Sequence, residues 1–161
     1  GDKAELWKER LADEERVKEM RTAAEGGCAD SMDNLGVWYQ MGMHGLKMSY
    51  ANAFQWYKRA ADANHPGGMA SAGSYLLSGR DVDKNVAHGM GLTFRAAEMG
   101  SDLAASDLGD YYYHGEHGLP QDNAQAAYWY ERVASSTQDD LNEEERQQCA
   151  ARLRELQEVA S

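Results

Sequence analysis

Two stretches of the chain nearly repeat one another: HGLKMSYANAFQWYKRAA, which spans His44–Ala61, and HGLPQDNAQAAYWYERVA, which spans His117–Ala134. They lie 73 positions apart and share glycine, leucine, alanine and a Trp-Tyr pair at equal positions. The polar residues change between them, and Asp122 stands where the first stretch has Ser49. A catalytic motif used twice would keep its polar groups, so the repetition indicates architecture.

A weaker third copy lies between these two, close to half of the interval. The copies therefore recur about every 36 to 37 residues. Because one such unit cannot bury its own apolar face, the period predicts an array of stacked helical repeats. The residues of the middle copy that match the other two are Ala72, Gly73, Leu76, Gly79, Val82, Ala87, Gly89, Leu92 and Gly100.

Each copy is predicted to form two helices. In the first helix, Met32, Leu35, Gly36 and Tyr39 fall on one face at helical spacing. The glycine costs about 1 kcal/mol of helix propensity, so we expect a neighbouring helix to approach it too closely for a side chain. We expect helix ends at Gly42, Gly79 and Gly115, N-caps at Ser49, Asn85 and Asp122, and large core residues at Trp56, Leu92 and Trp129.

The flanks extend the array to a single domain of eight helices. Residues 1–26 are predicted to be a partial repeat, followed by repeats at 27–64, 65–100 and 101–136 and by a capping helix at 139–160. We expect an all-α fold, an α-solenoid in which antiparallel helix pairs wind into a right-handed superhelix. The predicted apolar sides of the two end helices are Leu6, Leu11, Val17 and Met20, and Cys149, Leu153, Leu156 and Val159.

Composition limits the partners. Hydrophobic residues make up 42% of the 161 residues, and the formal net charge is −11. Such acidity argues against nucleic acid or an anionic membrane as a partner, and no apolar run is long enough to span a bilayer. A basic partner is compatible with this charge, although solubility is the simpler explanation. Two separated cysteines, Cys28 and Cys149, and no visible signal segment favour a cytoplasmic location, which stays open because the chain begins at Gly1.

The motif order is Leu-Gly-x-x-Tyr, then Gly, a loop with Gly and Leu or Val, an Asp cap, alanines, Trp-Tyr and Ala-Ala-x-x-Gly. This order resembles the Sel-one-like repeat family, a relative of the shorter tetratricopeptide repeat. The resemblance covers roughly residues 27–136 and is weakest in the middle copy, where Leu92-Thr93 replaces Trp-Tyr. It implies a curved, non-catalytic scaffold that binds other proteins or peptides, without a cofactor.

Enzymatic alternatives have little support. The best metal candidate is HGEHG, which contains His114, Glu116 and His117. The first copy keeps His44 but has methionine at the two other positions, so we expect these residues to fill a loop and predict neither metal ligands nor catalytic residues. No nucleophile motif or phosphate loop is present.

A binding scaffold of this type is expected to use the concave face lined by its first helices. Trp38, Tyr75 and Tyr111 form a predicted aromatic ladder there, although each ring can instead pack on a neighbouring repeat. The alternative is a self-assembling structural module that forms a homo-oligomer through the end helices. We expect the chain to be a monomer or a weak homo-oligomer. The candidate partner-binding residues are Asn34, Trp38, Met41, Ser71, Tyr75, Ser78, Asp107, Tyr111 and His114.

Overall fold

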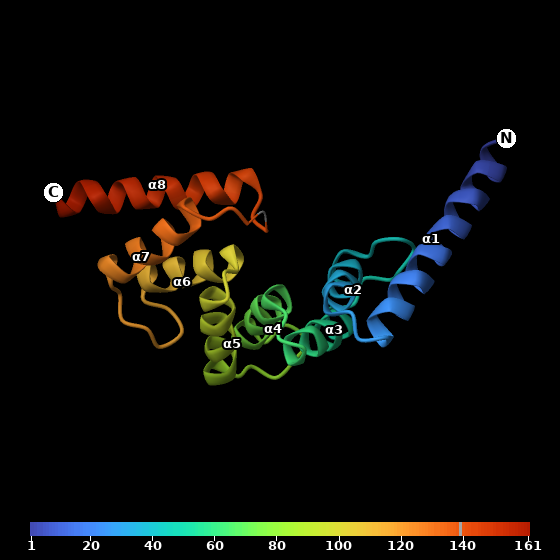
Figure 1. Cartoon of the computed structure of the whole chain (residues 1–161), viewed down its shortest axis with the longest axis horizontal. Coiled ribbons are helices and arrows are strands. Elements are labelled where there is room, and N and C mark those ends of the chain that lie inside the picture. Colours follow the sequence, from blue (N-terminus) through green and yellow to red (C-terminus); the bar gives the residue numbers. More distant parts are fainter. Residues whose placement is uncertain (139) are drawn as a thin grey trace.

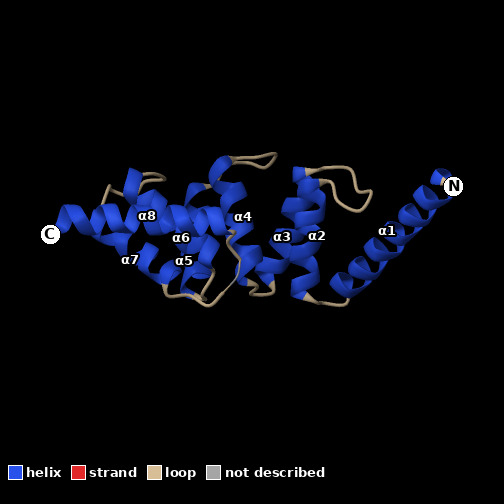
Figure 2. Cartoon of the chain, turned by 90° about the horizontal axis from the view of Figure 1, so that it is seen from above, coloured by secondary structure: helices blue, strands red, loops and turns tan. Residues whose placement is uncertain are grey.

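The computed structural model describes residues 1–138 and 140–161, and this part of the chain contains eight helices and no strand (Figure 2). The helices, in chain order, are α1 (Asp2–Glu25), α2 (Ala29–Met41), α3 (Tyr50–Asp62), α4 (Pro66–Ser78), α5 (Val86–Glu98), α6 (Asp102–His114), α7 (Asn123–Ala134) and α8 (Glu143–Ala160).

The helices pack in the order in which they occur. Each of the pairs α2/α3, α4/α5 and α6/α7 forms a hairpin, and each hairpin packs against the next. In Figure 1, α1 slopes upward from one end of the array and α8 lies along the top of the other end, so the chain curves around an open side. The predicted all-α solenoid is therefore confirmed.

In each of the two outer hairpins, α2/α3 and α6/α7, a close contact between a glycine and a tyrosine joins the two helices. A Cβ on Gly36 would lie 2.4 Å from Cε1 of Tyr57, and one on Gly109 would lie 2.5 Å from Cε1 of Tyr130. Both tyrosines are fully buried. Each glycine thus leaves space for an aromatic ring of the second helix, as the sequence predicted.

The middle hairpin uses the same glycine differently. Thr93 stands where the other copies have tyrosine, and a Cβ on Gly73 would lie 2.8 Å from its Oγ1 and 2.9 Å from the carbonyl oxygen of Gly89. A Cβ on Gly89 would in turn lie 2.9 Å from the carbonyl oxygen of Gly73. With the ring absent, the two backbones approach each other directly.

The predicted helix ends are confirmed. Gly42, Gly79 and Gly115 adopt left-handed conformations with φ of 66°, 69° and 70°, respectively, which glycine adopts without strain. The N-cap side chains of Ser49, Asn85 and Asp122 each accept a hydrogen bond from the backbone N–H three residues later.

Several residues predicted to be buried are partly or largely exposed. Trp56 is only half-buried and is covered by the Arg59 guanidinium, 4.4 Å from its ring, whereas its neighbour Tyr57 is in the core. Leu6 and Leu11 on α1 are 63% and 59% exposed. The N-terminal half of α1 extends away from the repeats (Figure 1), which leaves these side chains largely open to solvent.

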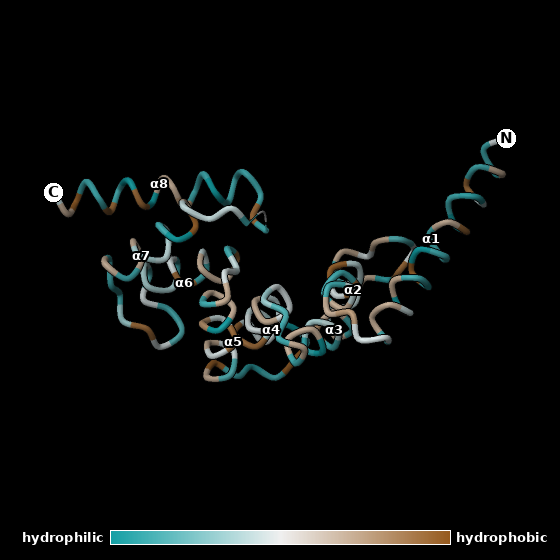
Figure 3. The backbone as a smooth tube through the Cα atoms, in the orientation of Figure 1, coloured by the Kyte–Doolittle hydropathy of each residue, from teal (hydrophilic) through white to brown (hydrophobic). Residues whose placement is uncertain are grey.

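The C-terminal helix closes the other end. Its residues are largely hydrophilic (Figure 3), but one side of the helix is apolar, and on that side Cys149, Leu153 and Leu156 are buried against the array. Val159, predicted to extend that side, is 72% exposed because it lies in the last turn of the helix. Asp139, the predicted first residue of this cap, lies outside the described residues.

Candidate binding surface

The first helices α2, α4 and α6 are neighbours in space, and we call their common surface the first-helix face. Asn34, Met41, Ser78 and His114 are exposed on these helices. Four further candidates, Trp38, Ser71, Asp107 and Tyr111, are half-buried, and Tyr75 is buried.

The aromatic ladder is built into the repeat packing. The Trp38 ring meets the His44 ring edge-on with centroids 4.3 Å apart, and Tyr111 meets His117 in the same manner at 4.6 Å. Both histidines lie in the glycine loops and have positive φ angles. These loop histidines therefore support the ladder rings.

Tyr75 corrects the expectation of a continuous exposed aromatic stripe. It is only 5% exposed, and its ring packs against those of Tyr50, Phe54 and Tyr57. Its hydroxyl donates a 2.8 Å hydrogen bond to Oε1 of Gln40, and burial raises its pKa to about 12. Tyr75 thus forms the floor of the surface and is not a free anchor.

A pocket of about 220 Å³ lies over this floor, where the three first helices meet. It brings together four of the predicted residues: Ser71, Tyr75, Ser78 and Asp107. Asn34, Trp38, Met41, Tyr111 and His114 do not line it. The remaining lining residues are Gln40, Ser74, Arg80 and Leu103, of which Gln40, Arg80 and Leu103 were missed because nothing in the repeat pattern distinguishes them.

Some polar groups of the pocket already have hydrogen-bond partners within the protein, and others do not. Oε1 of Gln40 accepts hydrogen bonds from the hydroxyls of both Tyr57, at 3.1 Å, and Tyr75. The Ser78 hydroxyl donates to the Tyr75 carbonyl oxygen at 3.3 Å. Within residues 1–138 and 140–161, the Asp107 carboxylate has neither a hydrogen bond nor an ion pair. Its burial, with the charges of Asp110 and Glu145, raises its pKa to about 7.

Asp110, one turn further along α6, connects this helix to α7 and α8. Its carboxylate accepts a 2.6 Å hydrogen bond from the Tyr130 hydroxyl and pairs with Arg152 of α8. Of these two aspartates, only Asp107 is free among the residues that the structure describes.

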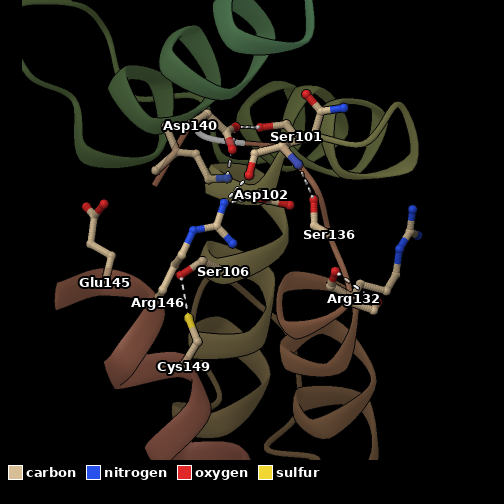
Figure 4. Close-up of polar contacts among 12 residues, drawn as sticks. Ser101, Asp102, Ser106, Arg132, Ser136, Asp140, Glu145, Arg146 and Cys149 are labelled. Atoms are coloured by element: carbon tan, nitrogen blue, oxygen red, sulfur yellow. Dashed lines mark hydrogen bonds and ion pairs between the residues drawn. The ribbon is translucent and has the colours of Figure 1, made fainter. Parts of the chain in front are cut away.

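A second polar network fixes α8 beside α6 (Figure 4). Arg146 donates to Oδ2 of the buried Asp102 at 3.0 Å, and Oδ2 of Asp140 accepts from the Ser101 hydroxyl and the Leu103 N–H, each at 3.3 Å. Burial raises the pKa of Asp102, while Arg146 and Ser136 oppose that effect. These contacts explain how a hydrophilic helix stays attached.

None of the residues described form a cluster of three or more histidine, cysteine or carboxylate side chains able to hold a metal ion. In HGEHG, His114 packs on Tyr113 and His117 on Tyr111. None of the described helices combines the length and apolar character needed to cross a bilayer.

Comparison with known proteins identifies the repeat. The Sel1 repeat family model matches residues 29–65, 66–101 and 102–136. The chain belongs to the Sel1 repeat family. Sel1 repeats generally mediate protein–protein interactions, and Sel1 repeat proteins are typically non-catalytic scaffolds.

Two solved structures share the fold of this Sel1 repeat chain. A Sel1 repeat protein from Oxalobacter formigenes is 27% identical with a TM-score of 0.64, over 84% of this chain and 98% of that one. The protective antigen c5321 of uropathogenic Escherichia coli, described as displaying an SLR fold, is 31% identical with a TM-score of 0.64. That match covers 71% of this chain and 24% of c5321.

A curated relative is much longer. The ERAD-associated E3 ubiquitin-protein ligase component HRD3A of Arabidopsis thaliana is 28% identical over 78 residues, which cover 48% of this chain. The match spans only 12% of HRD3A.

Proposed function

We propose that this Sel1 repeat chain is a non-catalytic scaffold that binds a protein or peptide segment on its first-helix face. The observation that carries the proposal is the pocket shared by α2, α4 and α6. Its floor is rigid, because Tyr75 is held by three aromatic rings and by Gln40. A preformed concave surface keeps the entropic cost of binding low.

The curvature of the array supports the same site. The chain bends around an open side (Figure 1), and solenoids use such surfaces for extended contacts. Asn34, Trp38, Met41, Tyr111 and His114 are proposed to lengthen the contact on either side of the pocket. The pocket residues Ser71, Tyr75, Ser78 and Asp107 would form its centre.

A library of random peptides displayed on phage, selected on the full chain, tests the proposal. Ser74 is exposed and lines the pocket, so Ser74→Trp fills the pocket without disturbing the core. Gln55→Trp adds the same ring to an exposed position of α3 and serves as the matched control. We expect Ser74→Trp to weaken the selected peptides at least about tenfold and Gln55→Trp to leave them unchanged. Equal binding to both variants would place the site elsewhere.

A second proposal, self-association through α1, rests on a different observation. Leu6, Trp7 and Leu11 are 63%, 61% and 59% exposed on the part of α1 that extends from the array. Adjacent large apolar side chains of this kind are typical of a contact surface. Sedimentation across a range of protein concentrations, with Trp7→Ala as the comparison, tests it, and a constant monomer would refute it.

A further inference from the structure

We propose that the pocket shared by α2, α4 and α6 selects a basic side chain, arginine or lysine, of the bound segment, and that the Asp107 carboxylate is its counter-ion. This inference rests on the proposed binding function and adds the chemistry of the partner. It assigns a recognition role to a residue that the repeat architecture leaves free.

Asp107 differs from the residues at the same position in the other two repeats. Its equivalents are Asn34 in the first copy and Ser71 in the second, so a negative charge occurs there in the third copy alone. The carboxylates that serve the fold have partners: Asp110 has Arg152 and Tyr130, and Asp102 has Arg146. Asp107 has no such partner in the part of the chain that the structure describes, although it is half-buried.

The charges near the Asp107 carboxylate favour a cation beside it. Asp110 and Glu145 act on it with the same charge and, together with burial, disfavour its ionised form. A cation placed beside Asp107 would relieve that repulsion, and a half-buried site strengthens the attraction compared with open solvent. An incoming cation thus restores the charge that burial disfavours.

The lining of the pocket suits an organic cation better than a metal ion. The described residues contain no group of three side chains able to ligate a metal. The pocket instead combines one carboxylate with the hydroxyls of Ser71 and Ser74 and with the apolar Leu103. This mixture suits a long side chain whose methylene groups contact Leu103 and whose charged end meets Asp107.

The pocket also contains a cation of its own, Arg80. Its guanidinium lies 4.9 Å from the centre of the Tyr50 ring, and it forms no ion pair with Asp107 among the residues described. The two charges therefore do not neutralise each other. A bound segment meets a negative wall on α6 and a positive one in the loop after α4.

The experiment uses peptides selected from the random library on the wild-type chain. Each selected peptide is resynthesised with its arginine replaced by citrulline or its lysine by glutamine, and all are measured on wild type, Asp107→Asn and Asp62→Asn. Asp62 is an exposed aspartate at the end of α3, so its variant makes the same charge change away from the pocket. Circular dichroism confirms that each variant is folded.

We expect one basic residue in each peptide to be required, and Asp107→Asn to weaken binding about tenfold or more. On this variant the neutral peptide should lose nothing further, whereas Asp62→Asn should behave as wild type. Peptides that are blocked by Ser74→Trp but are insensitive to both changes would overturn this inference and leave the binding function standing. Peptides insensitive to Ser74→Trp, or a library that yields no binder, would count against both.

Discussion

The substitution Gly36→Ala tests the packing that joins the two helices of a repeat. The added methyl group would lie 2.4, 2.5 and 2.9 Å from three carbons of the Tyr57 ring. This ring is only 2% exposed, and its hydroxyl is hydrogen-bonded to Gln40. It cannot turn aside freely, so α2 and α3 must move apart.

Two effects of opposite sign set the size of the change. Alanine favours the helix over glycine by about 1 kcal/mol, whereas overpacking a filled core costs about 1–3 kcal/mol and more when backbones must shift. Because the contact lies well inside van der Waals distance, we expect a net loss of about 1–2 kcal/mol. In a domain of this size that lowers Tm by about 2–8 °C.

Gly91→Ala is the matched control. Gly91 lies inside α5, is exposed, and would have no heavy atom within 4 Å of an added Cβ. There the propensity term acts alone, so we expect stabilisation of about 0.5–1 kcal/mol. Thermal unfolding followed by circular dichroism measures both variants. If Gly36→Ala proved as stable as Gly91→Ala, the glycine–ring contact would not be what defines the repeat.

Three further variants test charge and capping. Because the pKa of Asp107 is raised to about 7, ionisation of its carboxyl group opposes folding. The Asp107→Asn variant should therefore gain stability relative to wild type as pH rises from about 4 to 8, by at most about 4 kcal/mol. A difference in the free energy of urea unfolding that stays constant over this pH range would contradict this. Asp102→Ala leaves Arg146 without its carboxylate and should cost about 3 kcal/mol, with faster amide hydrogen exchange in α8 first; unchanged exchange there would refute the role of the ion pair. Asp122→Ala removes the N-cap of α7 and should lower the free energy of unfolding by about 1 kcal/mol, whereas an unchanged urea midpoint would show that the cap is dispensable.

The sequence predicts the helices well because each boundary depends on a local rule. The left-handed glycines and the side-chain N-caps act within a few residues of themselves, and all of those predicted were found. The prediction of Trp56 as a core ring was wrong, because Trp56 is half-buried and its neighbour Tyr57 is in the core. Neighbouring residues differ by only about 100° around a helix. Which of them faces Gly36 depends on how α2 and α3 pack against each other.

The binding surface was less predictable for the same reason. Equal positions in successive repeats do not have equal surroundings, so Trp38 and Tyr111 meet loop histidines while Tyr75 is enclosed by three rings. Among the residues described, Asp110 is paired and Asp107 is not, and this difference depends on Arg152 of α8, 42 residues away from Asp110 in the chain. No periodicity carries that information.

Binding of the partner segment on the first-helix face can be followed residue by residue in solution. The measurement is amide chemical-shift mapping of the isotope-labelled chain with a peptide selected on it. We expect the largest shifts on α2, α4 and α6, around Ser74, Ser78 and Asp107. Shifts confined to α3, α5 and α7, or to α1, would contradict it.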